Sequence, residues 1–160
     1  MKIGMNMLLW TADVTEEHYP LFAALKAEGF DGVELTVPDH RDATDRADLA
    51  SELDKQGLER TAIFSPDAET NPLSPDPAVR EAAKEKLIWA VRSAAELGSE
   101  VLAGPFHSAY ALFSGHPATE DERAWCAEVM RAGAEEGLGS WVLNVGKVGT
   151  ETTSIIITIT

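Results

Sequence analysis

Apolar positions along the chain recur with two different periods, and the two kinds of segment alternate. Short runs dominated by apolar residues predict buried strands. These runs occupy residues 3–9, 32–38, 60–64 and 100–103. Between and after the runs, apolar residues spaced three or four positions apart predict amphipathic helices. The predicted helices occupy residues 15–29, 49–58, 77–97 and 119–135.

Strands that alternate with helices predict an α/β fold with a parallel sheet and right-handed crossover connections. A doubly wound nucleotide-binding sheet would carry a glycine-rich phosphate loop after its first strand. The sequence at that point is Leu9-Trp-Thr-Ala12, which contains no glycine. Long loops follow the third and fourth predicted strands, at residues 65–76 and 104–116, and such loops are typical of the catalytic face of a barrel. The pattern therefore favours a barrel over a doubly wound sheet.

Chain length sets how much of a barrel can be present. A complete (β/α)₈ barrel typically needs about 250 residues, and this chain has 160. We therefore predict a partial (β/α)₈ TIM barrel of four βα units with a candidate fifth strand. Residues 1–136 form the predicted N-terminal half of the barrel domain. Residues 137–160 form a divergent tail, which is predicted to be strand-like because β-branched residues dominate its last part.

The richest candidate chemistry follows the fourth predicted strand. The apolar run that begins at Val101 ends at Gly104-Pro105, and His107 comes directly after it. Side chains at the C-terminal ends of barrel strands build the active site, so we interpret His107 as a substrate contact. The alternatives for this residue are metal binding in a divergent site and local hydrogen bonding within the loop.

Four more residues are candidates at or near the ends of the other predicted strands. They are Asn6, Trp10, Glu34 and Ser65. A carboxylate such as Glu34 among apolar neighbours needs either a partner or a raised pKa. A structural ion pair inside the barrel is therefore the alternative for Glu34, and core packing is the alternative for Trp10.

Net charge and cysteine content limit the classes of binding partner and the cellular compartment that we expect. The formal net charge is -14, which disfavours nucleic acid and anionic membrane surfaces, since both are bound mainly through clustered Lys and Arg. The single cysteine, Cys126, excludes an intrachain disulfide and indicates a reducing compartment. The N-terminus lacks the pattern of a signal peptide, and no apolar stretch reaches the roughly 20 residues of a membrane span. We therefore expect a cytoplasmic protein.

Four segments together resemble the sugar phosphate isomerase/epimerase family, which includes the ketose 3-epimerases. These segments are Met1-Lys-Ile-Gly-Met-Asn6, Leu25 to Leu35, Leu73 to Arg80 and Leu97 to Pro105. Their order and spacing across residues 1–135 carry the resemblance, and no single motif is diagnostic. The resemblance implies a xylose isomerase-like TIM barrel.

The resemblance also implies a reaction and a ligand. In the family, a divalent metal (Mn²⁺, Mg²⁺ or Co²⁺) holds two oxygens of a ketose, and two glutamates move a proton at the carbon beside the carbonyl. The family also places aromatic residues against the sugar at the end of the first strand. We therefore expect a small-molecule sugar as the partner, bound through Asn6, Trp10, Glu34, Ser65 and His107.

This chain departs from the family pattern where the metal ligands should lie. Those ligands come from the ends of strands 5 to 8, and Asn144 occupies the place of the first catalytic, metal-binding glutamate. An amide is neutral and cannot abstract a proton. We therefore predict no catalytic and no metal-binding residue, a chain truncated relative to the family, and weak or absent activity. The divalent metal is expected for full-length members and not for this chain.

Two alternatives involve no catalysis. One is a sugar-binding module, and the other is a half-barrel that associates with itself. An open parallel sheet leaves two bare strand edges and an apolar face, which favour association. We therefore expect a homo-oligomer.

Overall fold

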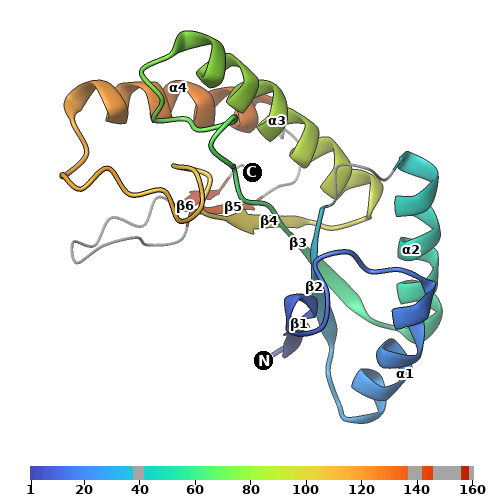
Figure 1. Ribbon diagram of the computed structural model, residues 1–160. Coiled ribbons are helices and arrows are strands. Elements are labelled where there is room, and N and C mark those ends of the chain that lie inside the picture. The colour runs from blue at the N-terminus through green and yellow to red at the C-terminus, as the bar shows by residue number, and fades with distance from the viewer. Residues whose placement is uncertain (38–41, 137–141, 146–155, 159–160) are drawn as a thin grey trace. The chain divides into compact units, whose positions relative to one another are not determined.

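The computed structural model describes residues 1–37, 42–136, 142–145 and 156–158. Strands alternate with helices along them, as the sequence predicts (Figure 1). The elements are β1 (Gly4–Asn6), the 3₁₀ turns η1 (Met7–Leu9) and η2 (Glu16–His18), α1 (Tyr19–Ala27), β2 (Gly32–Thr36), α2 (Ala43–Gln56), β3 (Glu59–Ile63), α3 (Pro77–Glu96), β4 (Val101–Gly104), α4 (Glu120–Glu136), β5 (Val142–Val145) and β6 (Ile156–Thr158). The order of hydrogen-bonded strands follows the chain, from β1 to β6. Contacts divide the chain into two compact units, residues 1–63 with 93–102, and residues 64–92 with 103–160.

The first unit contains a parallel sheet of β1, β2 and β3 with helices α1 and α2 (Figure 1). Side chains alternate between the two faces of a strand, so Val33 and Leu35 share one face of β2 while Glu34 and Thr36 share the other. Val33 and Leu35 are buried in an apolar core. The core residues are Met7, Val14, Phe22, Leu25, Val33, Leu35, Leu49, Leu53, Leu58 and Leu97. The opposite face of the sheet carries mostly polar side chains, with the apolar Ile63 beside Thr36 at the end of β3.

The first strand is shorter than its apolar run predicts. We expected a strand through Leu9, but β1 ends at Asn6 and residues 7–9 form a 3₁₀ turn. The physical reason is the Asn6 side chain, whose Oδ1 accepts a hydrogen bond from the Leu8 backbone N–H at 2.8 Å. Asn side chains that bond to the backbone two residues ahead begin turns. The chain therefore leaves the sheet at Asn6.

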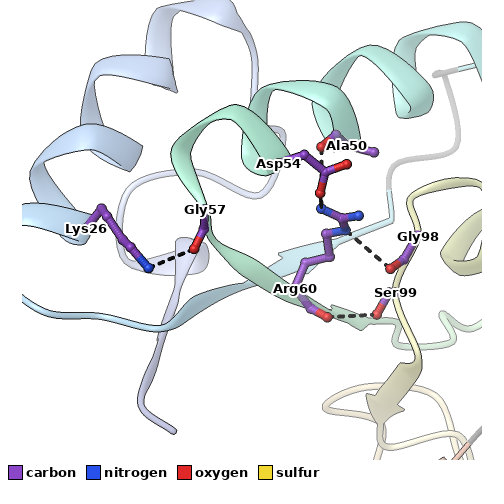
Figure 2. Close-up of polar contacts among 7 residues, drawn as sticks. All are labelled: Lys26, Ala50, Asp54, Gly57, Arg60, Gly98 and Ser99. Atoms are coloured by element: carbon purple, nitrogen blue, oxygen red, sulfur yellow. Dashed lines mark hydrogen bonds and ion pairs between the residues drawn. The ribbon is translucent and has the colours of Figure 1, made fainter.

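Arg60 is the centre of a polar network that joins α2, β3 and the turn before β4 (Figure 2). Its Nη1 donates to Asp54 Oδ1 at 2.5 Å and to the Ala50 carbonyl at 3.4 Å, and its Nε donates to the Gly98 carbonyl at 3.2 Å. The Ser99 hydroxyl donates to the Arg60 carbonyl. One guanidinium therefore satisfies a carboxylate and two backbone carbonyls that belong to different elements.

In the second unit, α3 packs against α4. Gly133 of α4 is buried, and a Cβ added there would lie 2.5 Å from the Leu87 side chain of α3. Two ion pairs join the same helices, Lys84 Nζ to Glu128 Oε1 at 2.6 Å and Arg92 Nε to Glu136 Oε1 at 2.7 Å. The absence of a side chain at Gly133 permits α3 and α4 to approach closely, and the two ion pairs connect the same two helices.

The C-terminal end of β4 also approaches another backbone segment closely. Gly104 has φ +143°, and a Cβ built on it would lie 1.9 Å from the Phe64 carbonyl oxygen. The Phe64 N–H donates to the Ala103 carbonyl at 2.9 Å. The Phe64 and Phe106 rings stack with centroids 6.2 Å apart. Only glycine provides both this dihedral and this clearance.

The predicted tail contains two described strands. β5 and β6 pair antiparallel, with Asn144 opposite Ile156. The rest of residues 137–160 lies outside the described residues, and the domain boundary after residue 136 stays a prediction. No helix among the described residues is both long and apolar enough to cross a bilayer.

Candidate sugar-binding site

The polar face of the β1–β3 sheet carries a row of hydrogen-bonding side chains. The strand register sets Asn6 beside Glu34, and Glu34 beside Thr61. Asn6 Nδ2 donates to Glu34 Oε1 at 2.5 Å, and both side chains are half-buried. Asn6 is the last residue of β1, and Glu34 is the middle residue of β2. Two of the five predicted site residues are therefore in direct contact.

A cavity of about 370 Å³ lies along this face of the sheet. Its lining includes Asn6, Glu34 and Thr61 as well as Lys2 and Glu59. The second pair forms a salt bridge at the N-terminal ends of the strands. The hydrogen bond from Lys2 to the Glu59 carboxylate raises the pKa of Lys2, and the negative charge of Glu59 adds a smaller increase. The cavity thus has an ionic end and an end lined by neutral and acidic hydrogen-bonding groups.

The Asn6–Glu34 pair suits a polyhydroxylated ligand. A carboxylate offers about four lone-pair positions and an amide nitrogen offers two donors, so one mutual hydrogen bond leaves capacity for ligand hydroxyls. In the described part of the chain, the partner of Glu34 is this neutral amide rather than a cation. The arrangement therefore fits hydrogen bonding to a ligand better than the structural ion pair that was the alternative for Glu34.

Trp10 follows the same turn that Asn6 begins. It is the C-cap residue of η1, and 44% of its surface is exposed. This exposure does not fit the alternative of core packing, since an amphipathic indole buried in a core would be covered. Thr36 is a polar residue that sequence reasoning missed. It shares the face of Glu34 on β2, and its Oγ1 is buried with no hydrogen-bond partner among the described residues.

Ser65 and His107 belong to the second unit. Ser65 is exposed directly after Phe64, and His107 is half-buried after β4. The His107 Nδ1 atom is buried and has no partner in the described part of the chain. This finding disfavours the alternative of local hydrogen bonding through that nitrogen. Among the five predicted residues, Asn6 and Glu34 are the pair that the structure shows in hydrogen-bond contact.

Burial gives His107 a pH-dependent effect on stability. Desolvation lowers the pKa of His107 below its ordinary value of 6.5, so the unfolded chain takes up this proton more readily than the folded one. Stability from this source is complete above pH 6.5 and is lost as the pH falls toward the folded pKa. We expect the melting temperature of wild type minus that of His107→Gln to fall between pH 7.5 and pH 5.5. A difference in melting temperature that stays constant across that pH range would show that burial does not lower the pKa of His107.

The loop at residues 65–76 is built from side chains that bond to the backbone. Asp67 Oδ1 accepts from the Glu69 and Thr70 N–H groups at 3.0 and 2.9 Å. Hydrogen bonding from the Thr70 hydroxyl is the largest cause of a lowered pKa of Asp67. Asn71 and Asp76 make similar bonds further along. The sequence marks such positions by their Asp and Asn residues, and Asp67 therefore has a structural role in its turn.

The described part of the chain does not contain a set of ligands that matches the metal site implied by the resemblance. No three His, Cys, Asp or Glu side chains gather there closely enough to hold a metal ion. Cys126 is half-buried, and burial raises the pKa of its thiol to about 11. A thiol with that pKa is protonated at neutral pH and is a poor ligand or nucleophile. The described residues therefore do not fit the metal site that the resemblance implies.

Solved structures similar to this chain include ketose 3-epimerases and sugar phosphate isomerase/epimerases. D-allulose 3-epimerase from Methylomonas sp. is 26% identical with a TM-score of 0.74, over 86% of this chain and 48% of that chain. L-ribulose 3-epimerase is 25% identical with a TM-score of 0.75, over 91% and 49%. A sugar phosphate isomerase/epimerase described as putative, from Anabaena variabilis, is 18% identical with a TM-score of 0.70, over 89% and 53%.

The chain spans about half the length of these structures. A comparison with curated proteins finds no match. The α/β fold of a partial TIM barrel, predicted from the sequence, is confirmed. The family model for a xylose isomerase-like TIM barrel matches residues 22–137, which is most of the chain. The chain therefore belongs to the xylose isomerase-like TIM barrel family.

Proposed function

We propose that this chain binds a ketose sugar and carries the strand 1–4 half of a sugar isomerase/epimerase site. The hydrogen bond between Asn6, at the end of β1, and Glu34, in the middle of β2, is the observation that carries the proposal. In barrels of this kind, side chains at the C-terminal ends of strands contact the substrate. Trp10 follows the end of β1 and belongs to the same unit as this pair, while Ser65 and His107 of the second unit are proposed as separate contacts from their places after β3 and β4 in the chain.

Several observations support a sugar as the ligand. The pair combines an acceptor carboxylate with a donor amide, and sugar hydroxyls both donate and accept. Trp10, an aromatic residue with 44% of its surface exposed, follows Asn6 by four positions in the sequence. A solved structure similar to this chain over 89% of its length is a D-allulose 3-epimerase in complex with D-allulose. We therefore choose D-allulose as the first ligand to test.

The proposal separates binding from chemistry. The parent reaction is the transfer of a proton at the carbon beside a ketose carbonyl, and it needs a base together with a group that stabilises the enediolate. The described residues supply hydrogen-bonding groups but no cluster of metal ligands. In the proposal, the chain binds and orients the sugar and contributes little or no proton transfer alone. We therefore expect the chain to bind the sugar without added divalent metal.

We expect Glu34→Gln to raise the dissociation constant for D-allulose about fivefold, because a hydrogen bond to a charged acceptor is stronger than one to a neutral acceptor by roughly 1 kcal/mol. The substitution keeps the shape of the side chain and an oxygen that accepts from Asn6. Binding is measured by chemical-shift titration in buffer with EDTA. A wild-type chain that binds D-allulose only after manganese is added would contradict the proposal.

Glu59→Gln is the matched control for this experiment. Glu59 lines the same cavity, but it lies at the N-terminal end of β3 and pairs with Lys2. Its substitution should leave the dissociation constant unchanged. Equal losses in both variants would indicate a general effect of charge rather than a site at the Asn6–Glu34 pair. Formation of the 3-epimer by wild type with Mn²⁺ would contradict the inactive part of the proposal.

A further inference from the structure

Two loops of the second unit are joined by hydrogen bonds between them. The first loop follows β3, and the second follows β4 and carries His107. The Ala109 N–H donates to Asn71 Oδ1 at 3.1 Å. The Tyr110 N–H donates to the Pro66 carbonyl at 2.8 Å. Neighbouring residues of the second loop are thus attached to the first loop.

Asn71 differs from the other polar residues of its loop. Its Oδ1 accepts from the Leu73 N–H at 3.1 Å and from the Ala109 N–H at the same distance. The Asp67 carboxylate and the Asp76 carboxylate accept backbone hydrogen bonds only from residues close in sequence, as far as the described residues show. One amide oxygen therefore both shapes its own turn and holds the second loop.

His107 lies between two fixed points of the second loop. On one side is Phe106, which is buried and stacks on Phe64. On the other side is Ala109, which is also buried and whose N–H bonds to Asn71. One residue, Ser108, separates His107 from this second point. The backbone that carries the imidazole is therefore restrained from both directions.

We propose that Asn71 is a positioning residue for His107, holding the loop after β4 so that the imidazole keeps one orientation for the ligand. The inference rests on the proposed function, because the ligand is the ketose proposed above. Asn71 touches the loop backbone and acts on the ligand only through His107. Removing its oxygen leaves the Ala109 and Leu73 N–H groups without this acceptor, and a buried donor that loses its partner favours rearrangement.

The test compares three variants of the full chain. Asn71→Ala removes the oxygen, Asn71→Asp keeps an oxygen in the same place, and Asp67→Ala removes turn bonds from the same loop without touching the loop after β4. The ring signals of His107 are followed in sugar-free protein by ¹H–¹⁵N NMR and assigned with His107→Gln. The dissociation constant for D-allulose is measured alongside.

We expect Asn71→Ala to shift the His107 ring signals and raise the dissociation constant about fivefold, the effect of losing one hydrogen bond. Asn71→Asp should restore both values toward wild type. Asp67→Ala should lower the melting temperature but change neither the His107 ring signals nor the dissociation constant. The inference is overturned if Asn71→Ala leaves the ring signals unchanged, or if Asp67→Ala shifts them equally. Wild type that binds no D-allulose would overturn the proposed function, while the ring signals would still decide the role of Asn71.

Discussion

Replacing Gly104 by alanine is expected to lower the free energy of unfolding by about 4 kcal/mol, the combined effect of backbone strain and steric overlap. Gly104 has φ +143°, a conformation that L side chains rarely adopt. The added Cβ would lie 1.9 Å from the Phe64 carbonyl oxygen. That oxygen belongs to backbone and cannot rotate away as a side chain can. The hydrogen bond from Phe64 N–H to the Ala103 carbonyl fixes the same contact.

Urea unfolding followed by tryptophan fluorescence measures this effect, and Gly115→Ala is the matched control. Gly115 also has a positive φ, +79°, but no atom lies within 4 Å of its added Cβ. Its substitution should cost about 1 to 2 kcal/mol from backbone strain alone. Similar losses at Gly104 and Gly115 would mean that the approach of Gly104 to Phe64 is not the cause. A Gly104→Ala chain that does not fold agrees with the expected direction.

The second large effect is expected at Arg60. We expect Arg60→Met to lower the free energy of unfolding by about 2 to 3 kcal/mol, the range for losing hydrogen bonds to charged groups. Methionine keeps part of the apolar stem, so the loss isolates the guanidinium. Its side chain is 14% exposed and bonds to Asp54 and to the Gly98 carbonyl (Figure 2). Lysine in its place should recover only part of the loss, because it cannot reproduce the planar fork.

Lys2→Met provides the comparison for an exposed ion pair. Lys2 also pairs with a carboxylate, that of Glu59, but both side chains are largely exposed. Exposed pairs of this kind add little to stability, because solvent and salt screen them. Urea midpoints measured for Arg60→Met and Lys2→Met should therefore differ clearly. Equal midpoints would show that the network around Arg60 adds no more stability than a surface salt bridge.

The sequence predicts the order of helices and strands but not every boundary, since α2 begins at Ala43 and the apolar spacing predicts a start at residue 49. Asp42 and Gly57 are the N-cap and C-cap residues of α2, and both belong to residue types that favour those positions. The first strand was predicted too long because an apolar run such as Met7–Leu9 suits a strand or a 3₁₀ turn equally. The side-chain hydrogen bond of Asn6 decides between them, and its geometry is not visible in hydrophobicity.

The sequence predicts Asn6 and Glu34 as site residues but not their contact. That contact depends on the strand register between β1 and β2, which follows from tertiary packing. Thr36 and Asn71 were missed for a different reason. A threonine in a strand and an asparagine in a loop are common, and only burial of the Thr36 Oγ1 and the bond from Ala109 distinguish them.

The loop at residues 66–76 holds its shape mainly through its own side chains. Asp67, Asn71 and Asp76 each bond to backbone a few residues away. Amino-acid changes in the packed helices can therefore accumulate over evolution without reshaping this loop. Selection on the conformation of this loop and selection on helix packing then act largely on different positions. An exchanged segment would need to keep the Asn71 oxygen, because that oxygen also accepts from Ala109 of the loop after β4.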